Sequence, residues 1–216
     1  MRPRISILDL GHSTEESMDR FMSNLNATID ENTWDLIVAP FDYEECTQTE
    51  VLAETDLLIL SPGTAKLGRP DTTEDTPSLR LYNLIQNMVI QGIPILGINA
   101  GHQAIANAYN WNIRRLTQAE LPGYQKERNI DLPGELFEFD PESRIMVNPK
   151  NNWVVDKNPL SAPGQGIYQP LVQDPRGGVA IAKVTGYKPV YGIQYNPSEG
   201  TRSFFQSFFR TTRERL

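Results

Sequence analysis

The stretch from Pro94 to Ala106 constrains the fold more than any other part of the chain. An apolar strand at residues 93–98 passes directly into a helix, and a Gly-x-Asn-x-Gly sequence centred on Asn99 spans the junction. The glycines allow the backbone to turn without side-chain clashes. This is the spacing of a nucleophile elbow, a tight strand-to-helix turn that presents its central residue above the edge of a sheet. The sequence therefore predicts Asn99 at such a turn.

Apolar runs of strand length alternate with helical segments through the first half of the chain. We expect strands at residues 5–10, 34–39, 56–60 and 93–98. One helix is expected to open at Thr14 and another to cover residues 78–91. Strands that alternate with helices indicate an α/β fold of three layers, with a mainly parallel central sheet and helices on both faces.

The second half of the chain has a different pattern. Residues 118–178 are rich in Pro, Gly, Asn and acidic residues, so we expect loops and a small antiparallel region there. Strands are predicted at 179–184 and 190–195, joined around Gly186. The terminal helix carries a stripe that is typical of core packing rather than of a partner-binding face, namely Phe204, Phe205, Phe208 and Phe209. Without a repeat or a linker, residues 1–216 are predicted to form one domain.

Charge and cysteine content argue against several classes of protein. The net charge is −7, and the arginines near the C-terminus are interrupted by Glu214, which indicates a solvated helix face rather than a nucleic-acid site. Cys46 is the single cysteine, so no internal disulfide can form, which suits a reducing compartment. No apolar run approaches the ~20 residues of a membrane span. We therefore predict a cytoplasmic protein that binds neither nucleic acid nor membranes.

Three motifs, in order along the chain, resemble those of the class I glutamine amidotransferase family. The run Gly97-Ile98-Asn99-Ala100-Gly101-His102-Gln103 is similar to the family's Gly-x-Cys-x-Gly-His-Gln. Leu60-Ser61-Pro62-Gly63 is similar to its Ser-Pro-Gly loop, which contributes to the oxyanion hole. Residues 192–197 resemble the segment Gly-Val-Gln-Phe-His-Pro-Glu, which carries the catalytic histidine and glutamate. The resemblance covers essentially the whole chain and implies a flavodoxin-like topology.

The family's catalytic triad is missing at all three matching positions. In the family a cysteine thiolate attacks the glutamine side-chain amide, a histidine moves the proton and a glutamate orients the histidine. This chain has Asn99, Asn196 and Ser198 there. A carboxamide is not a nucleophile at neutral pH, and Asn196 cannot titrate to act as a base. The resemblance thus implies a protein without catalytic residues for the usual glutaminase reaction.

Other residues do not restore the triad. Cys46 follows Glu44 and Glu45, an acidic setting that raises a thiol pKa. His102 matches a structural histidine of the family, so we predict a packing role. His12 follows the first strand, at the carboxyl end of the sheet, where it either faces the old pocket or lies in a surface loop.

The substituted site leaves three alternatives open: a decayed and partly filled cleft, ligand binding without glutaminolysis, or a new reaction. The two asparagines can hold one another across the cleft or bind a polar ligand. The candidate ligand-binding residues are Gly63, Asn99, Ala100, Gln103, Asn196 and His12. The acidic loop at 71–75 lacks the spacing of a metal cage, and no phosphate-binding loop occurs, so no metal and no cofactor are expected.

Three functions are consistent with this sequence. The first is an inactive amidotransferase-like subunit that binds, scaffolds or regulates a synthase-type protein partner, because family glutaminases deliver ammonia to such partners. The second is an enzyme that has rebuilt the cleft for another substrate. The third is a sensor that binds a small molecule resembling an amino acid, such as glutamine.

Overall fold

The computed structural model describes residues 2–11, 15–29, 34–40, 54–63, 67, 77–121, 128–133, 144–147, 152–159, 167–174, 177–186 and 188–216. Within these ranges the helices are α1 (Glu15–Asn26), α3 (Pro77–Ile90), α4 (Ala100–Ala108), the short 3-10 helix η2 (Glu199–Thr201) and α6 (Arg202–Glu214). The first strands are β1 (Arg4–Asp9), β2 (Asp35–Pro40), β3 (Leu57–Leu60), β4 (Ile95–Ile98) and β5 (Trp111–Arg115). The others are β6 (Arg128–Asp131), β7 (Arg144–Val147), β8 (Trp153–Pro159), β9 (Tyr168–Gln173), β10 (Val179–Val184) and β11 (Val190–Ile193).

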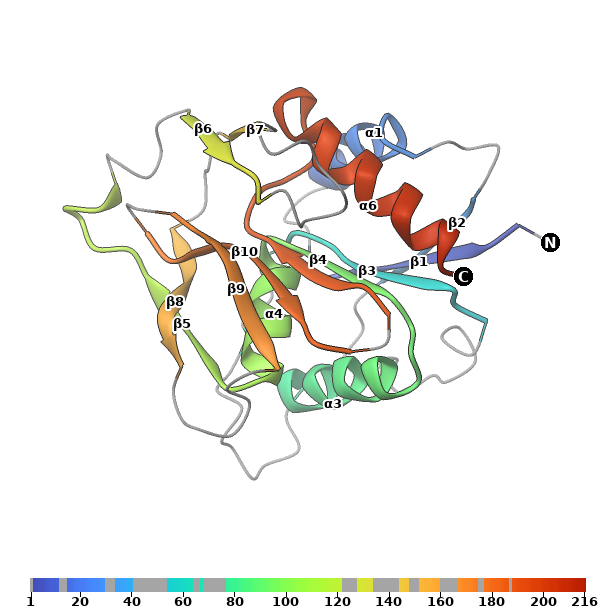
Figure 1. Ribbon diagram of the computed structural model, residues 1–216, viewed down its shortest axis with the longest axis horizontal. Coiled ribbons are helices and arrows are strands. Elements are labelled where there is room, and N and C mark those ends of the chain that lie inside the picture. Colours follow the sequence, from blue (N-terminus) through green and yellow to red (C-terminus); the bar gives the residue numbers. More distant parts are fainter. Residues whose placement is uncertain are drawn as a thin grey trace.

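The main sheet has the strand order β2-β1-β3-β4-β11-β10-β8-β5, and β9 pairs with β10 (Figure 1). From β2 to β11 neighbouring strands are parallel, and from β10 outward they are antiparallel. The parallel part has the order 2-1-3-4-5 of flavodoxin-like folds. Strands β6 and β7 form a separate antiparallel pair. The structure confirms the predicted α/β fold and its antiparallel region.

Helices cover both faces of the sheet, because the strand side chains alternate between two apolar cores. Ile5 and Ile7 of β1 pack in one core with α1 and α6. Leu58 and Leu60 of β3 pack in the other core with α3 and α4. Side chains of successive residues in a strand point to opposite faces, so a continuous apolar run is buried on both sides. Figure 1 shows α3 and α6 on opposite sides of the sheet.

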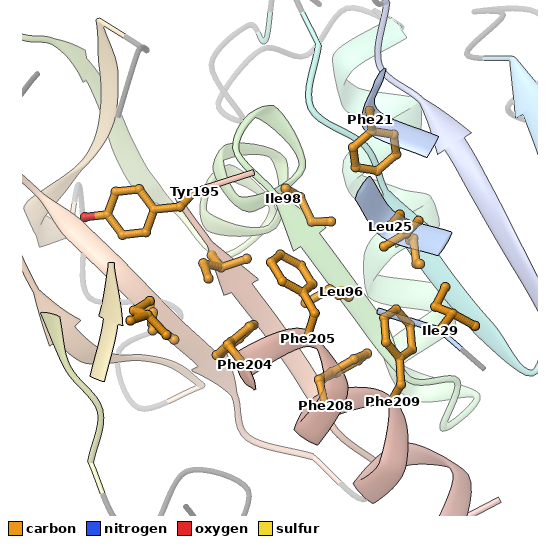
Figure 2. Close-up of a cluster of buried hydrophobic side chains, with 14 of the residues drawn as sticks. Phe21, Leu25, Ile29, Leu96, Ile98, Tyr195, Phe204, Phe205, Phe208 and Phe209 are labelled. Carbon is orange, nitrogen blue, oxygen red and sulfur yellow. The ribbon is translucent and has the colours of Figure 1, made fainter. Parts of the chain in front are cut away.

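The terminal helix packs its phenylalanine stripe entirely into the core. Phe204, Phe205, Phe208 and Phe209 are all buried. Figure 2 shows them beside Leu96 and Ile98 of β4, beside Leu25 of α1 and beside Ile29, which follows α1. Burial of an aromatic side chain of this size contributes on the order of 2–3 kcal/mol. The predicted core role of this stripe is therefore confirmed.

The predicted strands and helices of the first half agree with the structure to within two residues at their described ends. The start predicted at Thr14 for the first helix lies outside the described residues. β5 was not predicted, because Trp-Asn-Ile-Arg-Arg is too polar to stand out as a strand. Among the described residues, no helix has both the length and the apolar composition needed to cross a membrane.

Candidate functional site

Asn99 occupies a strained turn between β4 and α4. Its backbone has φ 53° and ψ −103°, a conformation that residues other than glycine rarely adopt. The Asn99 N–H donates to the carbonyl of Ile193 at 2.8 Å, and its own carbonyl accepts from the Gln103 N–H at 3.1 Å. Such strain costs on the order of 1–3 kcal/mol and persists where the surrounding structure fixes it. The turn thus keeps the geometry of a nucleophile elbow.

Glycine at position 101 lets the elbow pack against the neighbouring strand. A Cβ atom at Gly101 would collide with the carbonyl oxygen and side chain of Leu60, the last residue of β3. The first turn of α4 therefore lies directly over the end of β3. This packing brings the start of α4 beside the loop that follows Leu60.

That loop is fixed by Ser61, which is fully buried. Its Oγ accepts a hydrogen bond from the Leu10 N–H at 3.0 Å, and its own N–H donates to the Leu8 carbonyl at 3.0 Å. A Cβ atom at Gly63 would collide with the carbonyl of Leu10, so only glycine fits there. The loop that the sequence predicted to frame the site is thus tied to the end of β1.

Asn99 and Asn196 meet across the site, although they lie 97 positions apart in the chain. The Nδ2 of Asn99 lies 3.5 Å from Oδ1 of Asn196. This distance is at the long limit of a hydrogen bond, where the interaction is weak. Asn196 is exposed and Asn99 is half-buried. The two positions that match the catalytic cysteine and histidine therefore form a loose amide pair at the surface.

Ser198, at the position that matches the catalytic glutamate, caps a short helix. The Ser198 N–H donates to Oγ1 of Thr201 at 2.9 Å, and its Oγ lies 3.1 Å from the same atom. The Thr201 hydroxyl also donates to the Asn196 carbonyl at 3.0 Å. Ser198 thus takes part in a capping box that holds the Asn196 loop. Thr201 was not identified from the sequence. The signal that could have found it is its position three residues after Ser198, which is the spacing of a capping box.

Gln103 is almost fully buried behind the elbow. Its Nε2 donates to the carbonyl of Trp153 at 3.0 Å, and Nε2 of Gln194 donates to the same carbonyl at 3.3 Å. The amide nitrogen of Gln103 therefore makes a hydrogen bond within the protein itself. Of the sequence-predicted ligand residues, Ala100 is also buried, at the start of α4. Trp153 and Gln194 were not predicted to take part in the site.

His102 is buried completely, and its Nε2 lies 2.6 Å from the hydroxyl of Tyr168. Burial lowers the pKa of His102 to about 3, because the apolar surroundings disfavour the charged ring. A Cβ atom at Gly192 would collide with this ring, so the histidine also fills the space beside β11. The predicted packing role of His102 is confirmed. It presents no titratable group to the elbow at neutral pH.

His12, Cys46 with the neighbouring Glu44 and Glu45, and the acidic loop at 71–75 lie outside the described residues. Within the described ranges, no group of three His, Cys, Asp or Glu side chains could hold a metal ion. The three positions of the triad offer only amide and hydroxyl groups, which donate and accept hydrogen bonds without titrating at neutral pH. The start of α4 adds backbone N–H groups, which favour a negatively charged or polar ligand group.

Comparison with known proteins agrees with this geometry. The family model of the class I glutamine amidotransferases matches residues 13–210. A GMP synthase (glutamine-hydrolyzing) of Parafrankia sp. (strain EAN1pec) is 26% identical over 194 residues, which are 89% of this chain and 31% of the relative. The chain thus spans about a third of the length of this relative.

Solved structures with the same fold include a protein from Thermoplasma acidophilum that is described as one subunit of a GMP synthase. It has a TM-score of 0.69 and 19% identity, and the match covers 99% of this chain and 96% of that one. A glutamine amidotransferase from Thermotoga maritima has a TM-score of 0.60 and 15% identity, with 100% and 98% covered. PurLQS from Thermotoga maritima has a TM-score of 0.58 and 15% identity, with 98% and 99% covered. Since the family match runs over residues 13–210, this chain belongs to the class I glutamine amidotransferase family.

Proposed function

We propose that this chain is a catalytically inactive amidotransferase, a pseudoenzyme that serves as a binding or regulatory subunit of a synthase-type partner. The observation that carries the proposal is the amide pair of Asn99 and Asn196, which stands where the nucleophile and the base are needed. Neither side chain can form a thiolate or accept a proton at neutral pH. Ser198 is occupied in capping a helix. The protein therefore keeps the elbow and lacks the reactive groups.

The partner is proposed from two observations. Relatives include a GMP synthase, and the similar structures include one described as part of a GMP synthase and one described as PurLQS. Two exposed apolar side chains also lie near the site. Trp153 is 49% exposed, and its carbonyl accepts a hydrogen bond from Gln103. Met146 is 45% exposed, and its own carbonyl and Cβ lie against Gly200, two residues after Ser198. Trp and Met are enriched in protein interfaces. We propose that Trp153 and Met146 belong to a rim of the site that docks the partner.

A cytoplasmic location and a single domain over residues 1–216 are also part of the proposal. Both rest on sequence features, namely the single cysteine and the lack of a linker.

A glutaminase assay tests the proposed loss of glutamine hydrolysis. The natural protein is compared with Asn99→Cys/Asn196→His/Ser198→Glu and with Asn99→Cys/Asn196→His, which keeps the Ser198 cap. The expected result is no turnover by the natural protein and measurable ammonia release by at least one restored variant. Asn99→Cys alone is the control for a thiol without its base. Turnover by the natural protein, removed by Asn99→Ala, would overturn the proposal.

Affinity purification from the source cells tests the partner. We expect the natural protein to retain a synthase-type protein and Trp153→Ala/Met146→Ala to lose it. Ile90→Ala is the matched control, because Ile90 is 80% exposed and ends α3 just before β4 begins, whereas the elbow follows the other end of β4. Equal recovery with the natural protein and the double variant would show that this rim does not dock the partner.

A further inference from the structure

A groove lies between the end of α1 and the last turns of α6, away from the elbow. Its volume is about 630 Å³, within the range of small-molecule sites. Ile29 and Trp34 line one side, and Phe209, Arg210 and Arg213 of α6 line the other. Arg210 lies eight residues into α6, about 12 Å along the helix axis from its start near the elbow. The groove is therefore separate from the site of Asn99.

The floor of the groove is apolar and aromatic. The rings of Trp34 and Phe209 meet edge to face with their centroids 6.3 Å apart, and both side chains are almost fully buried. Ile29 is buried beside them, and Figure 2 shows it next to Phe209. Only 3–5% of each of these side chains is exposed, so the floor offers an apolar or planar ligand body mainly van der Waals contact with the residues that line the groove.

The wall contributed by α6 carries two positive charges. Arg210 and Arg213 are one helical turn apart and exposed, and neither pairs with a carboxylate in the described part of the chain. Glu214 adds one negative charge to the lining. Residues three apart on a helix face the same way, so both guanidinium groups can reach one ligand. Guanidinium groups bind carboxylates and phosphates through paired N–H donors.

We infer that this groove binds an organic anion, a carboxylate or phosphate carried on an apolar ring-sized body. The aromatic floor contacts the apolar body of the ligand, and the guanidinium groups of the two arginines bind its anionic group. A protein of net charge −7 repels anions in general, so two arginines with no carboxylate partner among the described residues, placed over an apolar floor, mark a local exception.

Calorimetric titration of the full chain with three probes tests the inference. Phenyl phosphate has both features, inorganic phosphate has the charge alone, and benzyl alcohol has the ring alone. Phenyl phosphate is expected to bind at least about tenfold more tightly than either of the others, because charge and ring contacts add. Benzoate, compared with phenyl phosphate, keeps the ring and changes the anionic group, so it distinguishes a preference for phosphate from one for carboxylate.

The variant Arg210→Ala/Arg213→Ala is expected to weaken phenyl phosphate binding by at least about tenfold. Arg115→Ala/Arg202→Ala is the charge-matched control, because both residues are exposed and lie outside the groove. It should leave the affinity within about twofold, the range of a screened surface charge. The melting temperature of each variant shows that it is folded. No saturable binding of phenyl phosphate, or equal weakening by both double variants, would overturn the inference.

Discussion

Gln103 and Gln194 share one hydrogen-bond acceptor. One side chain comes from α4 and the other follows β11, and their amide nitrogens lie 3.0 and 3.3 Å from the carbonyl oxygen of Trp153. Both glutamines are nearly fully buried, whereas the Trp153 side chain is 49% exposed. The shared carbonyl joins the elbow helix, the strand before Asn196 and the start of β8. It therefore ties the rim proposed for docking to the elements that carry Asn99 and Asn196.

We predict that the two glutamines are energetically coupled. Gln103→Met and Gln194→Met keep the side-chain volume, and each should cost about 1 kcal/mol of unfolding free energy, the net value of one hydrogen bond. The double variant should cost about 1 kcal/mol more than their sum, because it removes both side-chain donors from one partly buried carbonyl. Urea denaturation measures all three. Gln118→Met, at an exposed position, is the control and should be neutral; strict additivity would contradict the coupling.

We predict that glycine at position 99 relieves strain. Asn99 has φ 53° and ψ −103°, and glycine adopts such conformations without a steric cost. Glycine relieves ~1–3 kcal/mol of backbone strain, which exceeds the ~0.5–1 kcal/mol that its greater loss of chain entropy on folding costs. Asn99→Gly should therefore raise the free energy of unfolding by about 1 kcal/mol. Asn110→Gly is the control, because asparagine at φ 62° is common in left-handed turns. The idea fails if both variants shift stability equally.

Gly63 is predicted to tolerate no side chain. A methyl group there would meet the Leu10 carbonyl, which is backbone and can move only if the Ser61 loop shifts. Gly63→Ala should destabilise the protein by about 1–3 kcal/mol, the usual cost of overpacking. Gly186→Ala is the matched control, since the nearest atom, Cγ1 of Val89, would be 3.7 Å away. Thermal unfolding of the two variants measures the difference, and similar melting temperatures would argue against this close approach.

The buried His102 predicts acid sensitivity. Its pKa falls from 6.5 to about 3 on folding, so the unfolded chain binds a proton below pH 6.5 that the folded protein does not. Stability is therefore complete above pH 6.5 and falls by ~1.4 kcal/mol per pH unit as the pH drops toward 3. Denaturation between pH 7 and 5, where most carboxylates stay ionised, measures this slope.

The matched control for this slope is the other histidine. His102→Gln should flatten the pH dependence between pH 6.5 and 5, whereas His12→Gln should keep it. Tyr168→Phe should also keep it, because burial alone lowers the pKa of His102. A slope that survives in His102→Gln would show that another group is responsible.

Local sequence patterns were sufficient to predict most of the first half of the fold. The runs that became β3 and β4 are continuously apolar, as strands buried on both faces require, and Ser6 is the one polar residue between the charged ends of β1. β5 was missed because its polar residues do not alternate clearly. The role of Ser198 was also not predicted, because a serine that caps a helix and one that has merely replaced a glutamate look alike in sequence.

The sequence by itself determined the elbow at Asn99 and the absence of a reactive group there, because glycine spacing and side-chain chemistry are local properties. The tertiary structure alone decided what surrounds Asn99. Parallel pairing of β4 with β11 sets Gly97 beside Gly192 and Ile98 beside Ile193, and this register brings Asn196 to Asn99. The shared carbonyl of Trp153 and the groove beside α6 likewise join distant segments. Such contacts depend on how the strands and helices pack, which no local pattern encodes.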